Sequence, residues 1–213
     1  MKFDIVMYRN GGRKKWIKRF SQMGAESIAV IQTVTPPEIA RYVKFVVWNS
    51  KVSMFKYKKL FKWCKHYYIP HGFDPDEFCD NRKEREPGVL SVVNAFKKRG
   101  EILGYDKWRW INSNVKNVKI YGHGNEDISK DIKQCDSFSE LIDIYNKYYI
   151  YLNTTKESAM PRSRAEAMMC GCALVTTDNY DISDYVVNNK NGIITNDRNE
   201  MLSGINRILK NKD

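Results

Sequence analysis

The chain has 213 residues, of which 42% are hydrophobic and 29% charged, a composition typical of soluble globular proteins that excludes disordered and fibrous ones. Lys and Arg number 36 against 25 Asp and Glu, and the resulting net charge of +11 favours polyanionic or anionic-surface partners. Aromatic residues make up 13% of the chain, so the core needs neither disulfides nor a structural metal.

The cysteines form an odd, scattered set of five without the paired spacing of zinc sites, which favours reduced thiols in a cytoplasm. They are Cys64, Cys79, Cys135, Cys170 and Cys172, and we expect the last two to pack in the core. No apolar stretch approaches the roughly 18 residues of a membrane span, and the N-terminus lacks the features of a signal peptide. The expected location is therefore cytoplasmic.

Over the first 70 residues, short apolar runs alternate with stretches of helical period, a pattern typical of βα units and a parallel sheet. The predicted elements are strand 3–8, helix 13–23, strand 27–32, a short helix starting at Pro36-Pro37, strand 43–48, basic helix 52–64 and strand 67–69.

A second βα series follows residue 88. Its predicted elements are strand 89–93, helix 101–111, strand 118–121, helix 138–147, strand 149–152, helix 162–169, strand 173–177, a short helix at 182–187, the segment 192–194 and a closing helix 198–210.

The two series are separated by a stretch rich in Pro, Gly and charge, which is typical of a boundary between compact units. We therefore predict a first domain at 1–70, a linker at 71–88 and a second domain at 89–213. Two successive parallel α/β domains imply a cleft lined by the C-terminal ends of their strands, where ligands of such sheets bind.

Two loops that follow predicted strands carry features suited to phosphate binding. Gly11 and Gly12 lie between a strand and a helix, where glycine permits a tight turn and helix N–H groups face an anion, although an ordinary βα turn explains them equally well. Lys97, Lys98 and Arg99 follow the first strand of the second series and are placed to neutralise a diphosphate. A solvated basic turn is the alternative.

Two further segments could contact the nucleoside and the sugar. In the sequence Gly122-His123-Gly124, the glycines let a base or ribose approach the main chain, while a lone histidine is more often structural. Pro161 is expected at the first position of a helix, so that the N–H groups of 162–164 and two arginines form an anion site. Glu166 lies one turn further on, where it either binds ribose hydroxyls or forms a helical ion pair with Arg162.

The sequence RAEAMMCGCALVTT at 164–177 resembles the LxEAMAxGxPVVxT segment of GT-B glycosyltransferases, in particular the large retaining group called glycosyltransferase family 4. IPHGFDPDEF at 69–78 is similar to that family's interdomain segment, and DYVVNNKNGIIT at 184–195 is similar to its E-x-V-x-x-G-x-N-G-x-L-V segment. The resemblance implies two Rossmann-like lobes with parallel sheets that face across a cleft, the first lobe being reduced.

The resemblance also implies a function, namely the transfer of a sugar from a nucleotide diphosphate donor to an acceptor with retained configuration and without a bound metal or other cofactor. Arg99 and Lys98 then resemble the pair that grips the diphosphate, and Glu166 resembles the carboxylate that binds the ribose. Met160, Pro161, Arg162 and Ser163 resemble the phosphate and sugar loop. The family's two glutamates have seven residues between them; Glu157 and Glu166 have eight, so either Glu157 or Ser158 takes the first position.

Three hypotheses follow. The first is a minimal retaining glycosyltransferase acting on a glycan, a lipid-linked acceptor or a protein, in which Glu157 and Arg99 are catalytic. The second is an accessory protein that binds the nucleotide sugar without transferring it. The third is a glycosyltransferase that acts on nucleic acid. Basic amphipathic stretches at 13–20 and 51–65 also suggest peripheral contact with an anionic membrane, although two ordinary packed helices explain them as well.

Overall fold

The computed structural model describes residues 5–9, 14–31, 40–128, 134–159 and 161–211. It divides into two compact units: unit 1 contains Met1–Gly72 with Ser158–Met160, and unit 2 contains Phe73–Glu157 with Pro161–Asp213. The division after Gly72 falls inside the stretch in which the sequence places a linker.

Unit 1 contains a four-stranded parallel sheet with the order β1-β2-β3-β4. Each strand lies beside the next in sequence, and the helical segments make the crossovers that parallel strands require. The described elements are β1 Ile5–Arg9, α1 Lys14–Gln22, β2 Glu26–Ile31, the 3₁₀ turn η1 Ala40–Tyr42, β3 Phe45–Trp48, α2 Lys51–Tyr57, the 3₁₀ turn η2 Lys58–Phe61 and β4 Lys65–Tyr68.

One face of this sheet forms the core of unit 1. Alternate residues of the strands, among them Ala29, Val46 and Trp48, are fully buried and form one cluster with Ile17 of α1 and Phe61 of η2. Trp48 contacts Phe61 edge to face at 5.7 Å, and its Nε1 donates a hydrogen bond to Nδ1 of His66 at 3.0 Å. The period of two along each strand thus directs one set of apolar side chains toward the helices.

The other set of side chains faces away from these helices. Ile5 and Met7 of β1 are 62% and 66% exposed, and Tyr67 of β4 is 48% exposed. Phe45 and Val47 of β3 are half-buried between them in the pairing register. Parallel sheets usually have both faces covered, so this apolar face distinguishes unit 1 from ordinary α/β domains.

Unit 2 contains a five-stranded parallel sheet with the order β6-β5-β7-β8-β9. Its elements are β5 Glu86–Val92, α3 Gly100–Leu103, α4 Tyr105–Asn112, β6 Val118–Tyr121, α5 Phe138–Lys147, β7 Tyr148–Asn153, α6 Arg162–Met169, β8 Ala173–Thr176, the 3₁₀ turn η3 Ile182–Asp184, β9 Gly192–Ile194 and α7 Arg198–Lys210. The strand order doubles back at β5, because β6 lies on one side of β5 and β7 on the other. Such a reversal is the topological switch point at which doubly wound sheets bind ligands.

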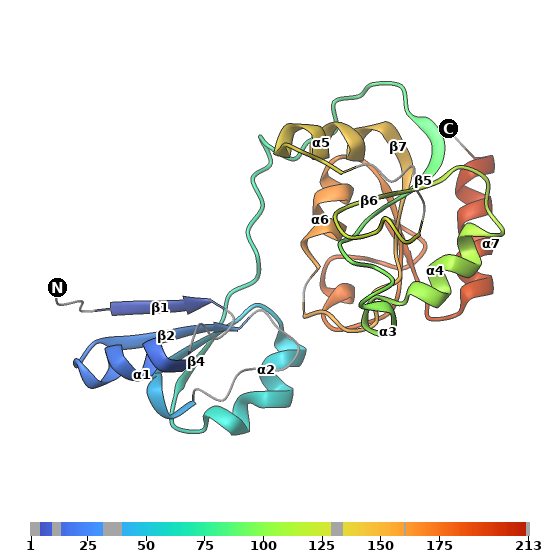
Figure 1. Ribbon diagram of the computed structural model, residues 1–213. Helices are drawn as coiled ribbons and strands as arrows, with labels where there is room; N and C mark the ends of the chain where they lie inside the picture. The colour runs from blue at the N-terminus through green and yellow to red at the C-terminus, as the bar shows by residue number, and fades with distance from the viewer. Residues whose placement is uncertain (1–4, 10–13, 32–39, 129–133, 160, 212–213) are drawn as a thin grey trace. The chain divides into compact units, whose positions relative to one another are not determined.

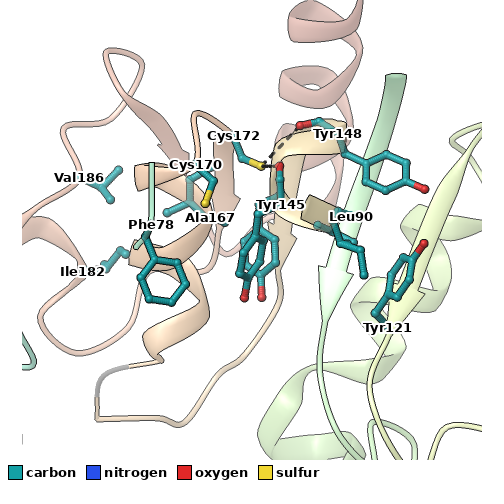
Figure 2. Packing of buried hydrophobic residues seen from close by; sticks show 13 residues of the cluster. Phe78, Leu90, Tyr121, Tyr145, Tyr148, Ala167, Cys170, Cys172, Ile182 and Val186 are labelled. Carbon is teal, nitrogen blue, oxygen red and sulfur yellow. Dashed lines mark hydrogen bonds between the residues drawn. The ribbon is translucent and has the colours of Figure 1, made fainter. Parts of the chain in front are cut away.

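Helices cover both faces of the unit 2 sheet (Figure 1). On one face, Tyr145 of α5 and Ala167 of α6 belong to the same core cluster as Tyr151 of β7. Figure 2 shows Tyr145 and Ala167 in this core. On the other face, α3, α4 and α7 pack against Ile150 and Leu152 of the same strand. The sequence Ile150-Tyr151-Leu152 therefore serves two cores, which explains why β7 is an uninterrupted apolar run.

Two of the cysteines belong to the core shown in Figure 2. Cys170 is fully buried and Cys172 is 5% exposed, which confirms that both pack in the core. The thiol of Cys172 donates to the carbonyl oxygen of Tyr145 at 3.0 Å. All five cysteines are free thiols.

Several predicted bounds are confirmed, and three predicted helices are corrected. The expected helix 101–111 is interrupted at Gly104, which has a φ of 70° and contacts the carbonyl of Thr154, where a Cβ would clash. The expected helix 52–64 becomes the 3₁₀ turn η2 after Tyr57. The expected helix at 182–187 is only the 3₁₀ turn η3. The short helix expected at Pro36-Pro37 lies outside the described residues.

Candidate functional site

The turn between β5 and α3 presents the predicted basic residues. Phe96 anchors the turn, because its side chain is 3% exposed and its backbone N–H donates to Oδ1 of Asn125 at 2.8 Å. Ala95 adopts a φ of 51° and donates its N–H to the carbonyl of His123 at 2.8 Å. Anchored in this way, the turn leaves Lys98 and Arg99 exposed at the start of α3.

The third basic residue of this turn has a different environment. Nζ of Lys97 lies 3.6 Å from a carboxylate oxygen of Asp127, and both side chains are about half exposed. An exposed pair of this kind contributes little to stability. Its charge is partly compensated within the domain, so Lys98 and Arg99 are the better placed cations.

The segment after β6 supports the turn after β5. Gly122 has a φ of 131°, and a Cβ at this position would clash with the carbonyl of Val93. Asn125 donates from Nδ2 to the carbonyls of Val93 and Gly122 at 2.7 and 3.0 Å. The glycine that we predicted for the approach of a base is therefore required by the protein's own backbone. Sequence reasoning missed Asn125, whose side chain joins the segment after β6 to the turn after β5. The only sequence feature that marks it is its position directly after Gly-x-Gly.

His123 lies at the surface, in the segment that follows the C-terminal end of β6. Its Nδ1 is 2.8 Å from Oε1 of Gln134, and its backbone N–H donates to Oδ1 of Asn94 at 2.9 Å. The exposed ring is accessible from solvent and lies after β6, next to the strand whose turn carries Arg99.

The loop between β7 and α6 is joined to α3 by hydrogen bonds. Oγ1 of Thr154 donates to the carbonyl of Leu103 at 3.0 Å, and the N–H groups of Lys156 and Glu157 both donate to the carbonyl of Ile102, at 2.9 and 3.1 Å. The backbone of Glu157 is thereby fixed near α3, the helix that begins after Arg99. The side chain of Glu157 is exposed.

The start of α6 differs from the prediction. Pro161 has a ψ of 112° and is the residue before the helix rather than its first turn. The N–H of Arg164 donates to the carbonyl of Pro161 at 3.3 Å, so it is not one of the N–H groups that remain for an anion. Arg162 and Ser163 are the first two helical residues.

Arg164 is a structural residue, which corrects the prediction that two arginines serve an anion site. It is 1% exposed, and its guanidinium donates to Oδ1 of Asn153 and to Oδ1 of Asn179, the latter at 2.7 Å. The same group donates to Thr177 and to the carbonyl of Thr155. A buried, fixed fork of five donors is well suited to such a network. Arg164 therefore holds the end of β7 and the loop that follows it.

Glu166 is nearly buried and has two partners. Tyr145 donates its hydroxyl to Oε2 at 3.1 Å, and Nε of Arg162 lies 3.3 Å from Oε1, which confirms the expected helical ion pair. Burial raises the pKa of Glu166, while the hydrogen bond from Tyr145 and the charge of Arg162 act in the opposite direction. Arg162 itself remains half exposed and lies over the ring of Phe73 at 5.9 Å.

These segments meet at one edge of the unit 2 sheet. The turn after β5 and the loop after β7 follow adjacent parallel strands, so both emerge at the switch point. Arg99, His123, Glu157 and Arg162 thus share an edge where cations, N–H groups and carboxylates could bind a diphosphate with sugars on either side. Gly11, Gly12 and Met160 lie outside the described residues.

Other features of the described residues lie away from this edge. A hollow lined by Met168, Gly171, Asn189 and Arg207 is found where β8 and β9 begin, on the opposite edge of the sheet. No group of three or more His, Cys, Asp or Glu suited to a metal ion occurs in the part of the chain that the structure describes. Within the same residues, no helix has the length and apolar character to cross a membrane.

Part of the chain matches the model of a known protein family. Residues 102–211 match the family model described as glycosyl transferases group 1. Because the match covers more than half of the 213 residues, the chain belongs to the group 1 glycosyl transferases. No curated protein sequence is significantly similar to it.

Solved glycosyltransferases of GT-B type share the fold. TarM of S. aureus superimposes with a TM-score of 0.75 at 16% identity, over 97% of this chain and 48% of TarM. The pneumococcal O-GlcNAc transferase GtfA, solved with UDP and GlcNAc, gives 0.74 at 15% identity, over 98% and 49%. Anabaena HepE, solved with UDP-glucose, gives 0.72 at 13% identity, over 98% and 70%. The chain thus has the GT-B fold and spans about half the length of TarM and GtfA.

Proposed function

We propose that the protein transfers a sugar from a nucleotide diphosphate sugar to an acceptor, with retention of the anomeric configuration and without a metal ion or other cofactor. The observation that carries this proposal is that the β5–α3 turn and the β7–α6 loop lie together at the switch point of unit 2. Residues 102–211 of this unit, which include the loop but not the turn, match the family. GtfA and HepE were solved with UDP or UDP-glucose, which supports a nucleotide sugar as the donor.

In this proposal Arg99 and Lys98 bind the diphosphate. The leaving diphosphate gains negative charge as the glycosidic bond breaks, and fixed cations stabilise that charge most when they are already positioned for it. The anchoring of the turn by Phe96 and Asn125 provides this positioning. The guanidinium of Arg99 can contact two phosphate oxygens at once.

Further roles are assigned from the sequence and, for the described residues, from their place at the edge. Met160, Pro161, Arg162 and Ser163 form the phosphate and sugar loop, in which the N–H groups at the start of α6 face the donor. Gly11 and Gly12 of unit 1 are assigned to the same part of the donor from their sequence alone.

Two carboxylates and the segment after β6 complete the donor site. Glu166 accepts hydrogen bonds from the ribose hydroxyls, for which Arg162 must release one of its oxygens. Gly122 and His123 lie beside the base. Glu157, fixed by its backbone next to α3 and exposed, faces the transferred sugar and acts with Arg99 in catalysis.

Calorimetry with the full chain tests donor binding. We expect saturable heat with at least one of the UDP-, GDP- and ADP-sugars, and weakening of about tenfold or more in Arg99→Ala, because a charge-assisted hydrogen bond contributes about 1.5–3 kcal/mol. Arg109→Ala is the matched control, since Arg109 is an exposed arginine of α4 in the same unit. Absence of heat with every donor, or equal losses in both variants, would contradict the proposal.

A second candidate function is a donor-binding accessory protein without transferase activity. It is favoured by one observation, namely that the chain spans about half the length of TarM and GtfA. Release of nucleoside diphosphate from the donor separates the two functions. A transferase hydrolyses its donor slowly and loses this activity in Glu157→Ala while donor affinity is kept. An accessory protein binds the donor but releases no diphosphate in either form.

A further inference from the structure

The net positive charge of the protein comes from unit 1. Residues 1–72 contain 15 Lys and Arg and only three Asp and Glu, a surplus of 12, whereas residues 73–213 contain 21 and 22. Between Glu38 and Asp74 there are eight basic residues and not one acidic residue. Donor binding in unit 2 therefore does not explain the surplus of positive charge. The surplus points to a separate function of unit 1.

The segment 51–63, formed by α2, η2 and the two residues after them, combines this charge with exposed apolar side chains. Phe55 is 64% exposed, Leu60 60% and Trp63 86%. Lysines alternate with them at 51, 56, 58, 59 and 62. Nζ of Lys58 lies 5.1 Å from the ring of Phe55, and Nζ of Lys62 lies 4.8 Å from the ring of Trp63. Aromatic rings and ammonium groups thus form one mixed surface, which we call the α2–η2 surface.

The other basic helix of unit 1 does not offer such a surface. Ile17 of α1 is fully buried, and Phe20 packs against the same core. Trp16 is 44% exposed but stacks on Phe20 at 6.1 Å, with the guanidinium of Arg19 over its ring. The apolar face of α1 is therefore used within the domain, whereas Phe55, Leu60 and Trp63 are left to solvent.

We propose that the α2–η2 surface docks onto an anionic lipid bilayer. Charge complementarity attracts the lysines to acidic headgroups, and each lysine held near the membrane surface adds to the free energy of binding. An exposed Trp and Phe with flanking lysines suits the interface between headgroups and acyl chains, where the rings enter and the ammonium groups stay in water. Nucleic acid would also attract lysines, but it offers no apolar layer for the aliphatic side chain of Leu60. The residues of this surface all belong to unit 1, and the proposal does not depend on the donor site proposed for unit 2.

Flotation of the full chain with lipid vesicles tests the proposal. We expect binding to vesicles of phosphatidylglycerol mixed with phosphatidylcholine, no binding to phosphatidylcholine alone, and release by added salt. The triple variant Phe55→Ser, Leu60→Ser, Trp63→Ser and the triple variant Lys58→Glu, Lys59→Glu, Lys62→Glu are each expected to lower the partition coefficient about a hundredfold.

Two controls match these variants in the kind of change, and the charge control also matches in number. Ile5→Ser with Met7→Ser removes exposed apolar side chains from the open face of the unit 1 sheet. Lys116→Glu, Lys119→Glu and Lys190→Glu reverse three exposed charges in unit 2. Both controls should bind as the parent does, and thermal melts show whether each variant is folded.

The proposal is overturned by equal binding to both kinds of vesicle, by no binding to either, or by parental binding of a folded α2–η2 variant. Loss of binding in the Ile5 and Met7 control would likewise overturn it, because the open sheet face would then be the docking surface. Salt-sensitive binding to duplex DNA in place of vesicles would assign the charge to nucleic acid instead. Donor calorimetry on the charge variant keeps this test separate from the proposed function, since donor affinity should not change.

Discussion

Units 1 and 2 are both parallel α/β sheets, yet they use their surfaces differently. The unit 2 sheet has helices on both faces and nearly balanced charge, whereas the unit 1 sheet has one covered face and a surplus of 12 positive charges. The comparison teaches that the net charge of the whole chain says nothing about the proposed donor site. Arg99 and Arg162, to which the proposal assigns donor binding, belong to a unit that is close to neutral.

The same comparison predicts unequal stability. Among the residues that the structure describes, unit 2 has two clusters of 13 and 12 buried apolar residues, and unit 1 has one cluster of nine. Domains of about 70 residues rarely gain more than about 3–5 kcal/mol from a single core. We therefore expect the units to unfold in separate steps, for which a single free energy of unfolding is not defined.

A matched pair of tryptophans gives the largest expected effect. Trp48 of unit 1 and Trp108 of unit 2 are both buried, and each donates its indole N–H, to His66 and to Ser91 respectively. Changing a buried tryptophan to alanine costs about 3–5 kcal/mol. Trp48→Ala should therefore unfold unit 1, whereas Trp108→Ala should leave unit 2 folded but destabilised.

Hydrogen exchange followed by mass spectrometry reads the two units separately. In Trp48→Ala, amide protection should be lost in β2, β3 and β4 and kept in β7 and β8. In Trp108→Ala, protection in unit 2 should fall without disappearing. If Trp48→Ala reduced protection equally in both units, they would unfold as one cooperative body and the comparison would be wrong.

The second expected effect concerns Glu166 and pH. Burial raises the pKa of Glu166 in the folded state above the ordinary value of 4.5, which applies to the unfolded state. At a pH between the unfolded-state and the folded-state pKa, the folded state therefore holds a proton that the unfolded state has released. The stabilising contribution is therefore present below pH 4.5 and is lost as pH rises through the raised pKa. Glu166→Gln removes this dependence and should stabilise unit 2 at pH 7, because the net effect of burial and of the two partners is to raise the pKa of the carboxyl.

Urea unfolding of unit 2 at pH 5 and pH 7 measures this difference. Asp143→Asn, which changes an exposed carboxylate of α5, is the control and should shift neither value. Under the proposed function, Glu166→Gln should also weaken donor binding by about tenfold, because an amide replaces one acceptor of the ribose hydroxyls. A variant less stable than the parent at pH 7 would show that the pair with Arg162 outweighs the cost of burial.

Periodicity predicted much of the unit 2 fold. Helices α5, α6 and α7 begin and end where the sequence places them, and in the structure Ser137 and Asp197 cap the starts of α5 and α7. The break at Gly104 was not predicted, because it depends on contact with Thr154, fifty residues away in sequence. A prediction from helical period alone therefore joined α3 and α4 into one helix.

The candidate site was predictable in position but not in every role. The strand ends place Arg99, Glu157 and Arg162 at one edge, which alternation of strands and helices suffices to show. The burial of Arg164 was not predictable, because arginines at 162 and 164 look alike in sequence. Only the packing of Asn153 and Asn179 around Arg164 distinguishes them.

The smallest expected effect is that of Ser137→Ala, which we compare with the change of the matching capping serine in unit 1. Ser50 accepts a hydrogen bond from the N–H of Ser53 at the start of α2, and Ser137 accepts one from the N–H of Glu140 at the start of α5, both at 3.1 Å. Serine-to-alanine changes at N-caps cost about 0.5–2 kcal/mol. Ser50 is fully buried and Ser137 is exposed, so Ser50→Ala should lie near the upper end of this range and Ser137→Ala near the lower end.

The structural effect of Ser50→Ala on unit 1 should be larger than the lost free energy of unfolding suggests. Ser50 caps the helix that carries Phe55, so fraying of α2 should disturb the α2–η2 surface as well as the small core of unit 1. Denaturation of each variant, followed by hydrogen exchange in α2 and α5, measures both effects. Equal losses of protection in the two helices would mean that unit 1 is as stable as unit 2, and that its uncovered sheet face carries no cost.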